Sequence, residues 1–191
     1  MATGKEVLII KMKQLILLIL ILSSIDISSQ DCTEIYLIRH AEKDRSDIKN
    51  RNPELNDLGK KRALKWVQVF KNIELDKIYS TNYNRTIQTV TPVSKENNID
   101  ISIYSPSKIN YKNFISNNIG SKVLVVGHSN TIPFFVNGLI NKEFYQQIDD
   151  LNNSNLYKVT ICNNKISHSL LYVNWKFSLI VILKAYYIIL I

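Results

Sequence analysis

The sequence is short of the residues that build metal sites and disulfide frameworks. Its 191 residues include two cysteines and three histidines, and these have no metal-ligand spacing. We therefore expect neither a bound metal nor a disulfide-rich scaffold. Internal repeats and low-complexity segments are also lacking, apart from two apolar ends. The length and the 46% hydrophobic content indicate one globular domain.

Acidic residues are the scarcer charged class. Twenty-four Lys and Arg residues outnumber sixteen Asp and Glu residues, giving a formal net charge of +8. The basic residues are spread along the chain, without a dense tract or a nucleic-acid-binding motif. We therefore expect no nucleic-acid partner. The positive charge suits an anionic small substrate equally well.

The amino end predicts an export signal. Lysines precede the apolar run 15–22, and serines follow it. This is the order of a signal peptide, and the run is shorter than the roughly 20 residues of a membrane span. We expect a signal peptide over residues 1–29, with Met12 as an alternative start, and a periplasmic or secreted protein. An uncleaved membrane anchor is the alternative.

The domain proper is expected over residues 32–174. In an oxidising compartment Cys32 and Cys162 can form a disulfide, and the sequence leaves this pairing and two free thiols both open. The apolar tail 175–191 contains Lys184 near its middle, which would be costly in lipid. A membrane-surface anchor, a core-packing extension and a segment without a folded role all stay open for it.

The body of the chain alternates between strand and helix patterns. This alternation predicts a three-layer α/β/α sandwich with a largely parallel central sheet. Pro92 is expected at a kink or in the first turns of its helix. The expected strands are 35–38, 76–80, 101–104, 123–126, 156–161 and 168–173, and the expected helices are 60–71, 86–97, 111–118 and 131–140.

Polar clusters follow three of the expected strands. Arg39 and His40 follow the first, the segment 80–85 follows the second, and His128 follows the fourth. Because the carboxyl ends of parallel strands meet at one edge of a sheet, we expect these clusters to lie together. Their chemistry suits phosphoryl transfer. Arg guanidinium matches phosphate oxygens, and a neutral imidazole with one free nitrogen attacks phosphorus without a metal or cofactor.

Four motifs carry a family resemblance. Arg39-His40-Ala41-Glu42, residues 55–63, residues 80–89 and Gly127-His128-Ser129 together resemble the histidine phosphatase superfamily, in its phosphoglycerate mutase-like branch. The short interval between the third and fourth motifs, residues 84–127, is similar to that of compact phosphohistidine phosphatases. The resemblance implies a phosphoglycerate mutase-like fold and no cofactor.

The resemblance also implies roles for single residues. His40 would be the phosphorylated nucleophile and His128 the second catalytic histidine. Arg39 and Arg85 would bind the phosphate. The expected supporting residues are Glu42 and Ser129, while Gly59 and His168 are expected to be structural.

The proton donor stays unassigned. In the family an acidic donor usually lies between the second Arg and the second His, and this interval contains only Glu96 and Asp100. Glu42 and Glu96 are the candidates. Without a donor, an imidazole or aryl-oxide leaving group is easier to expel than an alkoxide.

These features together predict a metal-independent phosphomonoesterase acting through a phosphohistidine on His40. A phosphoglycerate mutase-like phosphotransferase and a catalytically weak phosphate-binding module are the alternatives. The expected partner is a small phosphorylated substrate or a phosphoprotein. Membrane contact through the apolar ends, including a membrane-anchored form, stays open.

Overall fold

The computed structural model describes residues 12–14, 32–163 and 165–174. The signal peptide expected over 1–29 and the tail 175–191 lie outside the described residues, apart from the exposed helical residues 12–14. Within the described ranges, no helix combines the length and the apolar character that a membrane crossing needs.

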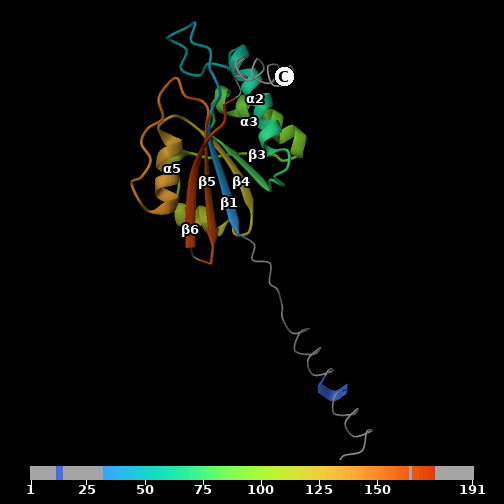
Figure 1. Cartoon of the computed structure of the whole chain (residues 1–191). Coiled ribbons are helices and arrows are strands. Elements are labelled where there is room, and N and C mark those ends of the chain that lie inside the picture. Colours follow the sequence, from blue (N-terminus) through green and yellow to red (C-terminus); the bar gives the residue numbers. More distant parts are fainter. Residues whose placement is uncertain (1–11, 15–31, 164, 175–191) are drawn as a thin grey trace, which may run out of the picture. The chain divides into compact units, whose positions relative to one another are not determined.

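Strands and helices alternate along the chain, as the sequence predicts (Figure 1). Most bounds lie within three residues of the expected ones. The elements are β1 (Thr33–Arg39), α2 (Asp57–Phe70), β2 (Lys77–Ser80), α3 (Asn84–Asn97), β3 (Ile101–Ile103), the 3-10 helix η1 (Pro106–Lys108), α4 (Tyr111–Ser116), β4 (Lys122–Gly127), α5 (Thr131–Ile140), β5 (Asn155–Cys162) and β6 (Lys165–Tyr172).

The strands form one six-stranded sheet in the order β3-β2-β4-β1-β5-β6. The four strands from β3 to β1 in this order pair in parallel. β5 runs antiparallel to β1, and β6 runs antiparallel to β5. The expectation of a largely parallel sheet is therefore confirmed. The reversal at β5 places the loop before it at the same edge as the carboxyl end of β1.

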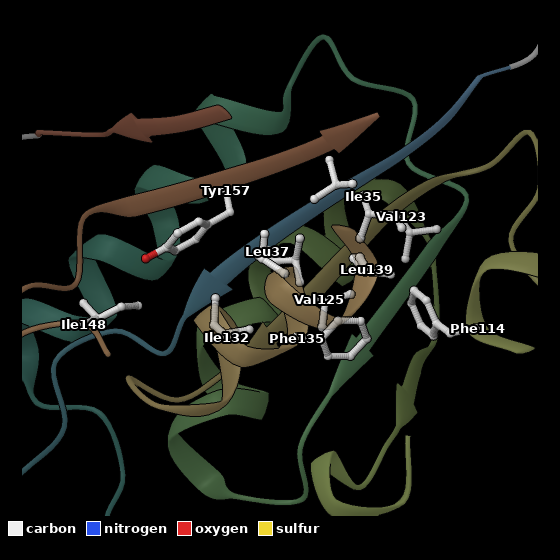
Figure 2. Packing of buried hydrophobic residues seen from close by; sticks show 12 residues of the cluster. Ile35, Leu37, Phe114, Val123, Val125, Ile132, Phe135, Leu139, Ile148 and Tyr157 are labelled. Atoms are coloured by element: carbon white, nitrogen blue, oxygen red, sulfur yellow. The ribbon is translucent and has the colours of Figure 1, made fainter. Parts of the chain in front are cut away.

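Both faces of the central strands are buried. In β1, Ile35 and Leu37 point into one core, whereas Tyr36 and Ile38 point into the other, because successive strand side chains alternate between faces. The first core is closed by α4 and α5, and Figure 2 shows Ile132 and Phe135 of α5 among its residues. The second is closed by α2 and α3. The three-layer α/β/α architecture is thus confirmed.

Helix α2 begins at a side-chain cap. The Asn56 side chain accepts a hydrogen bond from the Gly59 N–H and caps α2, which therefore starts three residues before the expected position. Gly59 has no room for a side chain, since an added Cβ would lie 2.1 Å from the Glu42 carbonyl oxygen.

Pro92 lies in the interior of α3 rather than in its first turns, which corrects one of its two expected positions.

Cys32 and Cys162 are joined by a disulfide, with their Cα atoms 4.7 Å apart. β1 and β5 are antiparallel neighbours, and Thr33 lies opposite Ile161. The residues just outside this pair therefore face one another. The pairing that the sequence left open is present in the structure, where it closes a loop across 130 positions.

We predict that reduction of this disulfide lowers the free energy of unfolding by about 2–5 kcal/mol, because a long closed loop restricts the unfolded chain. Urea denaturation with and without reductant measures the effect. The Cys32→Ser/Cys162→Ser double variant is the control, and reductant should leave its midpoint unchanged. Equal midpoints for the oxidised and reduced parent protein would contradict the prediction.

Candidate active site

Three parallel strands end at one edge of the sheet and deliver polar residues there. Arg39 at the end of β1 lies opposite Gly127 of β4, and Ser80 of β2 lies opposite Val126. The residues that follow the three strands are therefore neighbours. The His40 and His128 ring centroids are 5.5 Å apart. This is the convergence that the sequence predicts.

His40 is held in one tautomer. Its ring is buried, and Nδ1 lies 2.7 Å from the Ala41 carbonyl oxygen. Because a carbonyl oxygen can only accept, Nδ1 carries the proton and Nε2 keeps its lone pair. The backbone on either side is also fixed, since the His40 N–H donates to the Gly127 carbonyl and Asn153 donates to the His40 carbonyl. An imidazole with a free, fixed Nε2 is a competent nucleophile.

His128 has the opposite tautomer. Its Nδ1 faces an Arg85 guanidinium nitrogen at 3.4 Å and acts as the acceptor, because guanidinium can only donate. Nε2 then carries the proton and donates to Thr81 Oγ1 at 3.0 Å. The Thr81 hydroxyl is itself fixed by Thr86. Sequence reasoning placed Thr81 within a motif but assigned it no role.

Burial keeps both rings neutral. It lowers the pKa of His40 to about 3 against the hydrogen bond to Ala41, and the nearby Arg39, His128 and Arg85 lower it further. Burial likewise lowers the pKa of His128 to about 4, with added repulsion from Arg85, Arg39 and Lys43. At neutral pH the site therefore contains two uncharged imidazoles among cations.

Arg85 presents its guanidinium to the site from the first turn of α3. Its carbon lies 4.5 Å from the centre of the Tyr83 ring, which supports it by a cation–π contact. Its hydrogen bonds to the Arg51 carbonyl and to His128 are long, at 3.5 and 3.4 Å, and its buried Nε has no partner in the described part of the chain. Arg85 therefore has donors that can bind an anion.

Arg39 is engaged differently from its expected role. One terminal nitrogen donates to three backbone carbonyls of residues 149–152, and the other forms a 2.7 Å ion pair with Asp150. The buried Nε has no hydrogen-bond partner among the described residues. Both terminal nitrogens of Arg39 thus hold the loop before β5 against the site, and Nε is left for a phosphate oxygen.

Glu42 forms an ion pair with Arg62. Both of its oxygens accept hydrogen bonds from Arg62, and Arg62 also donates to Ser154. These contacts tie the segment after β1 to α2 and to the start of β5. Glu42 therefore contacts neighbouring elements, and its supporting role stays a prediction.

Of the other predicted residues, Ser129 lies at the site, whereas Glu96 and His168 do not. Ser129 lines the site cavity, and its backbone carbonyl accepts from the Ile148 N–H. Glu96 is exposed and follows Arg85 by eleven residues on α3, so it lies about 16 Å further along the helix axis. The structure therefore does not bring Glu96 to the site cavity, and the proton donor stays unassigned. His168 lies on β6 and does not line the site cavity; its ring nitrogen is hydrogen-bonded to the Tyr145 hydroxyl.

The side chains open onto a cavity of about 890 Å³ that both imidazoles line. Its charged lining consists of Arg39, Lys43, Arg85 and Asp150. Asp150 is the only carboxylate among these described residues, and Arg45 and Arg39 lower its pKa by hydrogen bonding to the ionised form. Within the described ranges, no group of three or more His, Cys, Asp or Glu residues could hold a metal ion.

Comparisons with known proteins agree with this geometry. The model of the histidine phosphatase superfamily (branch 1) matches residues 35–105, which include Arg39, His40 and Arg85. A search of curated protein sequences finds no match. Among solved structures, SixA of Agrobacterium tumefaciens, assigned as a phosphohistidine phosphatase, has a TM-score of 0.54 at 21% identity, covering 73% of this chain and 97% of that one.

Two further structures share the fold. A protein histidine phosphatase SixA complexed with tungstate has a TM-score of 0.55 at 13% identity, covering 73% of this chain and 96% of that one. A phosphoserine phosphatase of Entamoeba histolytica, in complex with phosphoserine, has a TM-score of 0.54 at 15% identity, covering 72% and 95%. This chain has the histidine phosphatase fold. The resemblance inferred from the four motifs is therefore confirmed.

In this histidine phosphatase fold, the loop 149–153 is a part of the site that the sequence did not predict. It supplies the carbonyls and the carboxylate that hold Arg39, and Asn153 that holds His40. The polar run before the strand 156–161 was the available signal. It indicates the active edge only once β5 is known to run antiparallel to β1.

We predict that neither His40 nor His128 titrates between pH 5 and 8, since their folded pKa values lie below the ordinary 6.5. Proton NMR of the ring Cε1 signals measures this directly. Unfolding exposes rings that bind protons below pH 6.5, so acidification from pH 7 to 5 should also destabilise the fold. A site imidazole that titrates near pH 6.5 would contradict the prediction.

Proposed function

We propose that this protein is a metal-independent phosphomonoesterase that works through a phosphohistidine on His40. The observation that carries the proposal is the free Nε2 of a neutral, fixed imidazole in a cationic cavity. A neutral imidazole keeps the lone pair that an attack on phosphorus requires. The surrounding guanidinium groups attract a phosphate dianion to it.

The reaction has two steps. In the first, His40 Nε2 forms a bond to phosphorus, and the bond to the leaving group breaks with its electron pair. In the second, water attacks the phosphohistidine, phosphate leaves and the neutral imidazole returns. Arg85 and the Arg39 Nε bind the phosphoryl oxygens and stabilise charge in both transition states. His128 orients Arg85 through Nδ1 and borders the same space.

The carboxylates near the site favour leaving groups that need little protonation. Asp150 is held ionised by two arginines, and Glu42 is paired with Arg62. Asp150, whose pKa is lowered, is therefore not a ready acid. An imidazole, as in a phosphohistidine, or an aryl oxide leaves more readily than an alkoxide under these conditions. The names of the two SixA neighbours support the first of these substrates, and a small aryl phosphate provides the corresponding assay.

A phosphate-binding module is the second candidate function. The engagement of Arg39 with residues 149–152 favours it, because this arginine has one nitrogen left for an anion instead of a two-nitrogen fork. Such a module would bind phosphate without turnover. Activity measurements separate the two functions.

We predict that His40→Asn lowers the kcat for an aryl phosphate by about 10³-fold or more, because the nucleophile is lost. Asparagine keeps an N–H that can reach the Ala41 carbonyl, so the fold should be preserved. The assay contains a chelator, since the proposed reaction uses no metal.

His168→Ala is the control, because this histidine lies on β6 and neither lines the cavity nor belongs to the loop 149–153. It should keep the parent rate. Full activity of His40→Asn, or loss of parent activity with chelator, would contradict the proposed mechanism. Phosphate binding by a parent protein without turnover would favour the second candidate.

We also propose that the protein is exported and that residues 32–174 form the mature domain. The apolar run 15–22 after lysines and the bonded Cys32 and Cys162 support this. We predict a mature amino terminus at Gln30, measured by mass spectrometry of the protein recovered from outside the cytoplasm. Recovery there with residues 1–29 still attached would favour the membrane-anchored alternative.

A further inference from the structure

The cavity around His40 has an apolar part as well as a charged part. Tyr83, Ile103, Tyr104 and Pro106 line it together with the cations. Tyr83 and Ile103 are 41% and 53% exposed, so the apolar part of the lining is accessible to a ligand. The charges suit the phosphoryl group. The apolar residues would contact the substituent to which the phosphoryl group is attached.

This apolar part continues into a groove of about 280 Å³. The groove and the cavity share Pro106, Ser107 and Thr131, so the two spaces are adjacent. The groove lies between the segment after β3 and the first turns of α5. Its other lining residues are Ile109, Tyr111, Phe134 and Phe135.

The groove is a formed surface because its floor belongs to the core. Phe135 of α5 is buried and packs edge-to-face against Tyr111 and Phe114, and Figure 2 shows it among the core residues. The Tyr111 ring also covers Gly138, where an added Cβ would lie 2.2 Å from it. Phe134 in contrast is 51% exposed and forms the open side.

Few polar groups in the groove are free to bind a ligand. The Thr131 hydroxyl accepts from the His128 N–H, and the Ser107 hydroxyl is paired with Ser105. The Tyr111 hydroxyl donates to the Phe134 carbonyl, at 3.5 Å. A ligand rich in hydroxyl groups, such as a sugar, would find few partners here. An apolar ring has no hydrogen bonds to water that it would have to give up on entering the groove.

We propose that this groove binds an apolar, ring-bearing group on the leaving side of a small phosphate substrate. The inference rests on the proposed function for the placement of the phosphoryl group at His40. The groove's continuity with the His40 cavity favours this occupant, since the shared residues let the substituent of a phosphate near Arg85 extend from the cavity into the groove. The size of the groove suits one ring system rather than a folded partner.

The test uses phosphonates, whose carbon–phosphorus bond the proposed reaction does not break. Calorimetry compares benzylphosphonate with 2-naphthylmethylphosphonate on the full chain. We expect the naphthyl compound to bind about tenfold more tightly, as for about 50–60 Å² of additional apolar surface removed from water. Phe134→Gln should reduce this advantage to about threefold or less. Glutamine is a good helix former, so α5 should be preserved.

Leu64→Gln is the matched control. Leu64 is 62% exposed on α2 and lines neither the cavity nor the groove. This variant should keep the tenfold ratio. Equal affinities of the parent for the two phosphonates, or an unchanged ratio in Phe134→Gln, would overturn the proposal. A tenfold ratio in a protein that hydrolyses no ester would support the groove while contradicting the phosphatase reaction.

Discussion

The parallel pairing of β1 with β4 is the constraint on which the candidate site depends. Arg39 lies opposite Gly127, and the His40 N–H donates to the Gly127 carbonyl at 2.9 Å. A slip of one residue would turn each side chain of β1 to the other face and bury the wrong set in each core. Packing of both faces thus specifies the register, and the register brings the two histidines together.

Gly127 shows how tightly this edge is built. An added Cβ there would lie within 3 Å of Thr131, Ile132 and Tyr104. A larger residue at the end of β4 would therefore displace side chains of α5 and of the segment after β3. This close approach also places Thr131 next to the His128 backbone and at the boundary of the apolar groove. Core packing and the shape of the site are consequences of the same contacts.

Sequence reasoning reached the residues whose positions follow from local patterns. Apolar runs located the strands, and strand ends located His40, His128 and Arg85 at one edge. It did not reach contacts that depend on the direction of a distant strand or on the reach of a long side chain. Arg39 reads as a phosphate ligand from its motif, yet its terminal nitrogens extend to residues 149–152 because β5 reverses direction. The ion pair of Glu42 with Arg62 likewise follows only from the way α2 packs in the folded domain.

The charge of the cavity links its stability to its ligand. Three cations and one carboxylate line the larger cavity, which leaves a net charge of +2 when both imidazoles are neutral. Protonation of either histidine would add charge to groups that already repel one another, so the cations add to burial in keeping both imidazoles uncharged. A phosphate dianion would neutralise the cavity without protonating His40. The positive field that would attract such an anion therefore also helps to preserve the lone pair on His40 Nε2.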